Sequence, residues 1–199
     1  MSLAPEKLIN FPAAVPDSAG IPSSVRDGML IAPYNDSNFV DSLITEHATE
    51  IAAIIVEPLQ RIIPPAPGFL EALRGLCTQH GILLIFDEVV TGFRFDYGGA
   101  QETYGVVPDL CTLGKVTGGG FPSAAVVGRA DIMAHFDKAQ VGSDGFLMQL
   151  GTLSGNPVAA VAGLKTLEIL RRPGQYDKLR ANGQYLMDAL GQCLEASGH

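Results

Sequence analysis

The chain has few cysteines, few histidines and few basic residues. Its three cysteines (Cys77, Cys111 and Cys193) are odd in number and widely spaced, which fits neither a disulfide framework nor a zinc site. The four histidines show no spacing typical of metal ligands. We therefore expect no metal centre, and a reducing cytoplasm is the simplest location.

The chain also lacks a basic block and a long apolar run. Asp and Glu outnumber Lys and Arg by 21 to 13, which gives a formal net charge of −8 and argues against a nucleic-acid or anionic-membrane partner. The longest apolar runs, at residues 51–56 and 82–86, have the length of strands and are far too short to span a bilayer. No apolar signal region opens the sequence, so we expect neither export nor membrane insertion.

The sequence has enough apolar residues to bury a core. With 199 residues, of which 47% are hydrophobic, it reads as one globular unit. The apolar runs predict strands that alternate with amphipathic segments typical of helices, with run 51–56 buried on both faces. We expect strands at residues 51–56, 82–86, 110–113 and 124–127, and helices at 38–47, 68–80, 131–136, 157–170 and 176–195. This alternation predicts an α/β fold with a mostly parallel sheet flanked by helices.

The chain is expected to have three parts. Residues 1–38 hold five prolines and predict an extended or loop entry segment, with one short strand near residues 29–31. Residues 39–172 hold the alternating elements, and residues 173–199 hold a C-terminal helix. Gly81 is placed to end one helix, and Asn156-Pro157 to start another.

Two residues carry the strongest chemical signal. Asp87 follows the predicted strand 82–86, and Lys115 lies in the run Cys111-Thr-Leu-Gly-Lys-Val-Thr-Gly-Gly-Gly-Phe-Pro122. A lysine can form an imine with the aldehyde of pyridoxal phosphate, while a carboxylate keeps the pyridine nitrogen protonated. The glycines would let the backbone approach a bound group, and apolar neighbours predict a desolvated amine that loses its proton easily.

Other interpretations of these segments exist. Glu57 and Asp87 both follow predicted strands, where parallel sheets bind ligands, but such a residue is ordinarily a turn former or helix cap. The run ending in Asp87-Glu88 also resembles the magnesium-binding strand of P-loop ATPases. That interpretation fails because Gly114-Lys115 is followed by Val116 and lies after the acidic strand. Residues 151–157 fit either a phosphate site or simple capping by Ser154 or Asn156.

Together these segments resemble the class III aminotransferases, which are fold-type I pyridoxal-phosphate enzymes, and especially their glutamate-1-semialdehyde 2,1-aminomutase branch. The matching segments are residues 53–58, 64–74, 84–94, 98–101, 108–110, 112–115, 118–120 and 151–157. The resemblance implies the large domain of the aspartate aminotransferase-like fold. It also implies transfer of an amino group between small amino compounds and keto or aldehyde compounds.

The resemblance assigns roles to five residues. Lys115 would be the Schiff-base lysine and would move the substrate proton, and Asp87 would pair with the pyridinium nitrogen. Val89 would pack on a face of the ring, and Glu57 would join the hydrogen-bond network around it. Thr152 would reach the cofactor phosphate of a second subunit, which implies a homodimer with shared active sites.

The sequence departs from the family in two ways. Family members are much longer, so residues 39–172 resemble an incomplete large domain and residues 173–199 would lead toward a missing small domain. The segment 57–64 is shorter than the aminomutase version and carries Arg61, which leaves a general amine or amino-acid transaminase open. A catalytically silent piece that folds or dimerises without turnover is the alternative.

Overall fold

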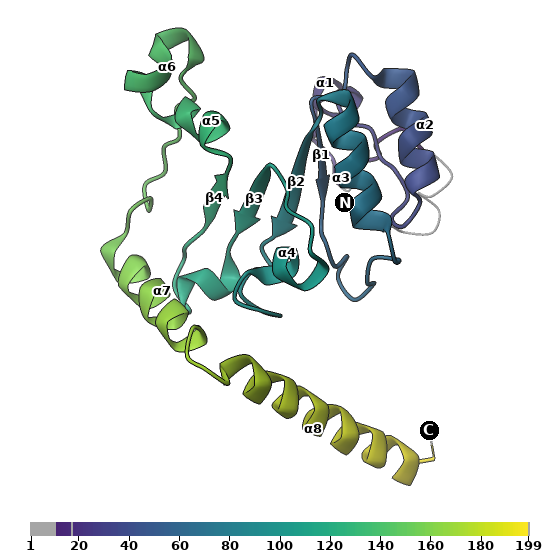
Figure 1. The fold of residues 1–199 in the computed structure, drawn as a ribbon, viewed down its shortest axis with the longest axis vertical. Coiled ribbons are helices and arrows are strands. Elements are labelled where there is room, and N and C mark those ends of the chain that lie inside the picture. The colour runs from purple at the N-terminus through teal and green to yellow at the C-terminus, as the bar shows by residue number, and fades with distance from the viewer. Residues whose placement is uncertain (1–10, 17, 199) are drawn as a thin grey trace. The chain divides into compact units, whose positions relative to one another are not determined.

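The computed structural model describes residues 11–16 and 18–198, which form an α/β fold (Figure 1). In chain order the elements are α1 Ser23–Asp27, α2 Ser37–His47, β1 Ala53–Val56, α3 Phe69–His80, β2 Leu83–Glu88, α4 Gly99–Tyr104, β3 Leu110–Leu113, η2 Lys115–Gly118, β4 Ala125–Gly128, α5 Ala130–Met133, η3 Ala134–Phe136, α6 Lys138–Gly145, α7 Pro157–Leu170 and α8 Gln175–Ala196. All nine predicted strands and helices are present, and their ends differ from the predicted bounds by no more than two residues. The helix predicted at residues 131–136 is divided into α5 and η3.

The four strands form one sheet in the order β1-β2-β3-β4. β1 and β2 are parallel, with Val56 paired to Phe86. β2 and β3 run in the same direction, because Leu84 hydrogen-bonds with Asp109 and Asp87 with Thr112, a constant offset along both strands. Only β4 runs antiparallel to its neighbour. The predicted mostly parallel α/β sheet is therefore confirmed.

The contacts divide the described chain into two compact units. Unit 1 holds the residues up to 86 together with 106–109, and unit 2 holds residues 87–105 and those from 110 onward. β2 begins in unit 1 and ends in unit 2. The three-part division at residues 38 and 172 stays a prediction.

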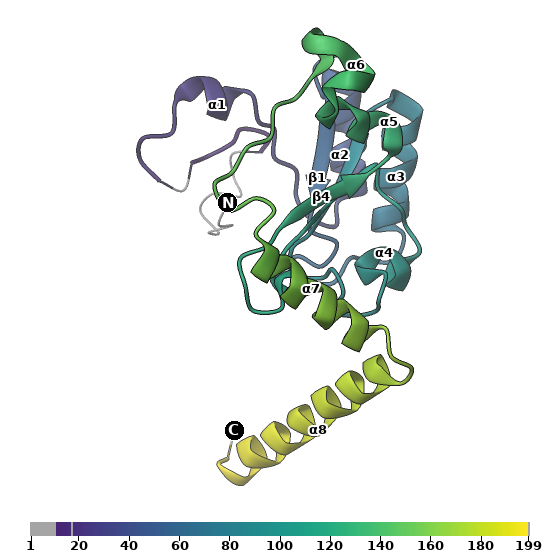
Figure 2. The same ribbon diagram turned by 90° about the vertical axis from the view of Figure 1, so that its left-hand side faces the viewer.

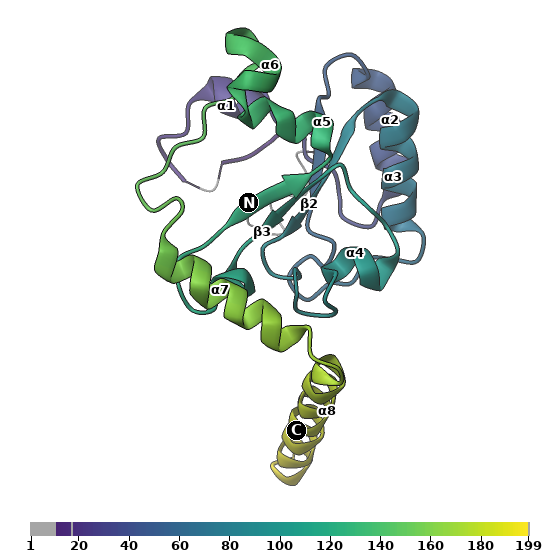
Figure 3. The same cartoon turned by 60° about the vertical axis from the view of Figure 1, so that its left-hand side comes forward.

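In unit 1, α3 packs beside β1 and β2, and α2 packs on α3 (Figures 1 and 3). The side chain of Asp36 caps α2 by accepting from Phe39 N at 2.9 Å, and Gly81 ends α3 with a φ of 68°. The core is apolar and draws on both helices and β2: Val40, Leu43, Ile44, Phe69, Leu70, Leu73, Cys77, Leu84 and Phe86. Burial of these side chains is the main stabilising contribution to unit 1.

In unit 2, α7 packs on the short η2 turn that follows β3 (Figure 1). A Cβ on Gly119 would stand 2.6 Å from Ala162 O of α7, and a Cβ on Gly163 would collide with Thr117 O. Small residues on both sides therefore allow the close approach. After Gly174, whose φ is 75°, α8 continues as a long helix beyond α7, and α5 and α6 follow β4 (Figure 2).

Several expectations about the elements were wrong or incomplete. β1 is not buried on both faces: its residues are half-buried or exposed, and Ile55 is 57% exposed. β2 extends through Glu88 rather than ending at Phe86. In place of a strand at residues 29–31, Leu30 forms an isolated bridge with Ala13. The short helices α1, α4 and α6 carry little apolar periodicity and were missed; α6 is kinked at Gly142.

Candidate cofactor site

Asp87 lies near the end of β2 and is half-buried. Its Oδ1 accepts hydrogen bonds from Val89 N and from Thr112 Oγ1, both at 3.1 Å. Within residues 11–16 and 18–198, no hydrogen bond to Oδ2 is formed. The bond from Val89 N is the local turn that the ordinary interpretation expects. The open Oδ2 could accept a hydrogen bond from the N–H group of a bound ligand. Asp87 therefore has features of both a turn former and a ligand-binding carboxylate.

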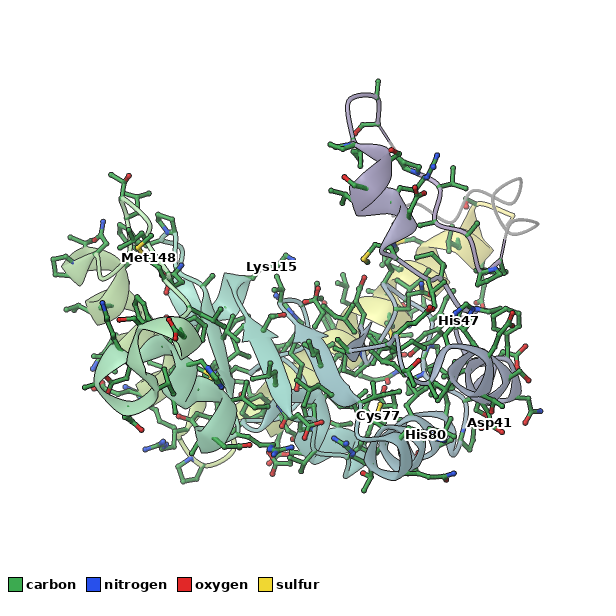
Figure 4. All side chains as sticks on the ribbon, turned by 90° about the horizontal axis from the view of Figure 1, so that it is seen from above. Asp41, His47, Cys77, His80, Lys115 and Met148 are labelled. Atoms are coloured by element: carbon green, nitrogen blue, oxygen red, sulfur yellow. The ribbon has the colours of Figure 1, made fainter. Side chains whose placement is uncertain are left out.

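Lys115 begins η2 directly after the extended Gly114. Its φ of 48° places a non-glycine residue in the left-handed region, which is uncommon and concentrates at functional sites. The predicted desolvation is wrong for this chain: Lys115 is exposed, and in Figure 4 its side chain extends away from the strand ribbons. Its apolar neighbours in the sequence, Leu113 and Val116, do not bury it in the folded chain.

Val89 connects the two segments that carry Asp87 and Lys115. A Cβ built on Gly114 would stand 3.3 Å from Val89 Cγ1, so Val89 packs on the backbone of the residue before Lys115. Asp87 meanwhile bonds to Thr112, three residues before Lys115. Thus β2 and β3 bring Asp87, Val89 and the Lys115 turn to one edge of unit 2, as expected for the carboxyl ends of parallel strands.

The other predicted residues are placed differently. Glu57 is half-buried and follows β1 in unit 1, where Tyr34 Oη donates to the neighbouring Pro58 O at 2.9 Å. Thr152 is exposed in the turn before α7. Asn156 caps α7 through bonds from Val158 N and Ala159 N at 2.9 and 3.3 Å, which confirms the capping interpretation for Asn156. The phosphate role of Thr152 stays a prediction.

Sequence reasoning missed two residues near Asp87. In the sequence, Thr112 stands out only as part of the run 111–122, and Glu88 stands out only as the residue after Asp87. The signal for Thr112 lies in the parallel register, because the offset of 25 that joins Leu84 to Asp109 also joins Asp87 to Thr112. Glu88 has no such signal. The apolar run ends at Phe86, so the sequence does not show that β2 continues through Glu88 and buries its side chain.

In the described part of the chain, His, Cys, Asp and Glu side chains do not form a cluster that could hold a metal ion. Its three cysteines are free thiols, two buried and one exposed. No helix among the described residues combines the length and apolar character needed to cross a membrane.

Residues 11–199 match the sequence pattern of the class III aminotransferases. The chain belongs to this family. A glutamate-1-semialdehyde 2,1-aminomutase from Pelotomaculum thermopropionicum is 50% identical over 187 residues, which cover 92% of this chain and 42% of that protein. The chain therefore spans well under half the length of this curated relative.

Solved structures of transaminases share the fold. An omega-transaminase from Sphaerobacter thermophilus is 40% identical with a TM-score of 0.85, and the match covers 94% of this chain and 43% of that one. A transaminase with pyridoxal phosphate bound is 28% identical with a TM-score of 0.83 over 94% of this chain and 44% of its own. A β-phenylalanine aminotransferase from Variovorax paradoxus is 39% identical with a TM-score of 0.69, covering 79% and 36%.

Proposed function

We propose that this chain carries the ring-binding and lysine-bearing part of a pyridoxal-phosphate-dependent aminotransferase. The observation that carries the proposal is the geometry of Asp87: one oxygen is held by Val89 N and Thr112 Oγ1, and the other is open. Lys115 stands on the adjoining turn with an exposed amine. These residues fit the cofactor, because it needs a carboxylate for its ring nitrogen and an accessible amine for its aldehyde.

When bound, pyridoxal phosphate supplies an electron sink that makes the bonds at the substrate's amine-bearing carbon labile. The protein's own residues do the rest. The carboxylate of Asp87 holds the proton on the ring nitrogen, and Val89 provides an apolar surface for one ring face. Lys115 Nζ would carry the proton to and from the substrate's amine-bearing carbon.

The substrates in this proposal are a small amino compound and a small keto or aldehyde compound. Family membership supports amino-group transfer, and the relatives include both an aminomutase and transaminases. The segment after β1 forms a tight turn in which Gln60 and Ile63 exchange backbone hydrogen bonds. Arg61 adopts a φ of 59° there, and Ile62 is 91% exposed. This turn is the place where we expect substrate preference to differ between the two activities.

The proposal includes a homodimer with shared sites, in which Thr152 serves the partner's cofactor phosphate. An exposed apolar patch supports it: Val158 and Val161 of α7 lie with Phe121 around a shallow apolar hollow, and Leu164 is exposed on the same helix. Thr152 is exposed in the turn that leads into the same helix.

The test is covalent labelling of the 199-residue chain. The protein is mixed with pyridoxal phosphate, treated with borohydride to make the bond between amine and aldehyde permanent, and mapped by peptide mass spectrometry. One equivalent of label on Lys115 supports the proposal, and Lys115→Ala should remove it without lowering the melting temperature. The exposed Lys138 and Lys178 are internal controls. Label scattered evenly over them would instead favour the silent alternative.

A further inference from the structure

Glu88 is a buried carboxylate held entirely by uncharged donors. Its side chain is 1% exposed. Oε2 accepts from Thr91 Oγ1 at 2.9 Å and from Ala100 N at 2.6 Å. Oε1 accepts from Gln101 Nε2 at 2.9 Å, and Cys111 Sγ lies 4.0 Å away. A buried carboxylate is costly unless its oxygens are hydrogen-bonded, so this set of donors is needed for the strand end to be buried at all.

Two glycines make room for the Glu88 carboxylate. Gly99 has a φ of 67°, and a Cβ there would collide with Oε2. The same Cβ would stand 3.2 Å from Gly92 Cα. A Cβ on Gly92 would itself stand 2.8 Å from Glu88 O and 2.6 Å from Leu113 Cδ2. Side chains larger than hydrogen are therefore excluded at both positions, and the turn after β2 and the start of α4 close around one carboxylate.

The hydrogen bonds around Glu88 are linked to Asp87 through neighbouring residues of β2 and β3. Successive side chains of a strand point to opposite faces of a sheet, so Asp87 and Glu88 lie on opposite faces of the end of β2. Thr112 bonds to Asp87, and Cys111, the residue before it, faces Glu88. Fixing Glu88 to α4 and to the Thr91 turn therefore fixes the rotation of the strand end that presents Asp87.

We propose that Glu88 is a positioning residue: its hydrogen bonds to Thr91, Ala100 and Gln101 hold the end of β2 so that Asp87 Oδ2 stays aimed at the cofactor ring nitrogen. This inference rests on the proposed function for its chemical purpose. The geometry that it requires, a fixed Asp87 turn, is present in the protein without cofactor and can be measured there.

The decisive variant is Glu88→Gln. The amide keeps the volume but turns one acceptor into a donor, which would face Ala100 N or Gln101 Nε2. The matched control is Asp109→Asn, which alters another buried carboxylate; Asp109 Oδ2 accepts from Arg74 Nη1 and Leu84 N, both at 2.8 Å, in unit 1. If Glu88→Gln does not fold, Gln101→Leu is used as the test variant in its place, because it removes only the donor Gln101 Nε2 from Glu88.

Two readouts separate positioning from stability. Amide hydrogen exchange of the cofactor-free protein follows Val89 N, which bonds to Asp87. We expect Glu88→Gln to speed its exchange about tenfold, a change of about 1.4 kcal/mol, while Asp109→Asn speeds exchange at Leu84 and leaves Val89 unchanged. Titration with pyridoxal phosphate should give a dissociation constant about tenfold higher for Glu88→Gln than for Asp109→Asn. Each variant is measured the same number of degrees below its own melting temperature.

The outcomes distinguish the two proposals. If Glu88→Gln leaves both Val89 exchange and cofactor affinity as in the control, Glu88 only stabilises the fold and the positioning proposal is overturned, although labelling of Lys115 would still support the proposed function. If the unaltered chain takes no label on Lys115, the proposed function fails for this chain. The exchange at Val89 then decides the positioning role alone.

Discussion

Thr112 Oγ1 donates a 3.1 Å hydrogen bond to Oδ1 of Asp87, from the neighbouring strand β3 to the end of β2. Val89 N donates to the same oxygen. The carboxylate is therefore held at one oxygen by two donors, and its second oxygen keeps its full capacity to accept. Because the two oxygens of Asp87 differ in this way, a change of one oxygen tests whether Oδ2 binds the cofactor ring nitrogen.

Asp87→Asn should weaken cofactor binding without unfolding the chain. The amide oxygen can still accept from Val89 N and Thr112 Oγ1, but its NH2 group faces the ring N–H instead of a negative charge. A hydrogen bond to a charged group contributes about 1.5–3 kcal/mol, so we expect the dissociation constant of pyridoxal phosphate to rise at least about tenfold. Fluorescence titration measures it.

The companion variant Thr112→Val separates orientation from charge. It removes one bond to Oδ1 and keeps the carboxylate, so the expected loss of affinity is smaller, about 1 kcal/mol. Equal affinities for Asp87→Asn and the unaltered chain would show that Oδ2 does not meet the ring nitrogen.

The sequence predicts the regular elements well where a local signal exists. Gly81 and Asn156 end and cap helices as expected, because capping depends on residues within one turn. The exposure of β1 could not be predicted in this way. A run of β-branched residues indicates a strand but does not say whether other elements cover both faces of the sheet there.

The candidate site was predictable in its residue types but not in its environment. The pairing of Asp87 with a lysine turn follows from two motifs, and the parallel register brings them to one edge. The exposure of Lys115 does not follow, because apolar neighbours in the sequence do not show which atoms cover the side chain in the folded chain. Glu88 could not be identified either, because its donors come from Thr91, Ala100 and Gln101, which only the folded turn after β2 brings together.

Gly119→Ala should destabilise the lysine turn against α7. A Cβ there would meet Thr166 Oγ1 at 2.5 Å and Ala162 O at 2.6 Å, and overpacking of this kind costs about 1–3 kcal/mol. Gly120→Ala is the matched control, because its φ is also positive but no heavy atom lies within 4 Å. It should cost only the backbone penalty of about 1–2 kcal/mol. Urea unfolding of both variants measures the difference, and equal losses would show that α7 does not restrain this turn.

The two buried thiols predict a loss of stability at alkaline pH. Burial, with a smaller contribution from Asp109, raises the pKa of Cys77 from 9.0 to about 11 despite the opposing charge of Arg74. Burial, followed by the charges of Glu88 and Asp87, raises the pKa of Cys111 to about 12. Above pH 9 the unfolded chain releases these protons while the folded chain keeps them, so the free energy of unfolding falls as pH rises from 9 toward 11–12.

Each thiol contributes a slope of about 1.4 kcal/mol per pH unit in that window. Urea unfolding at pH 8.0, 9.0 and 10.0 measures it, and Cys77→Ala should make the decline shallower. Cys193→Ala is the control, because Cys193 is exposed and its removal should leave the slope unchanged. A decline of the same steepness in Cys77→Ala would mean that other groups cause it.

Val161→Asp should weaken self-association of the chain. Val161 is 66% exposed at the centre of the apolar patch on α7, between Val158 and Leu164. If a second copy covers this patch, the carboxylate loses its hydration on association, which costs several kcal/mol. We therefore expect the dimer dissociation constant, measured by sedimentation equilibrium, to rise at least about tenfold. Lys178→Glu on α8 is the control, because Lys178 is exposed and lies on a different helix from the patch. A chain that is monomeric at micromolar concentration, or a Val161→Asp dimer of unchanged affinity, would exclude α7 from the interface and leave the shared-site role of Thr152 without support.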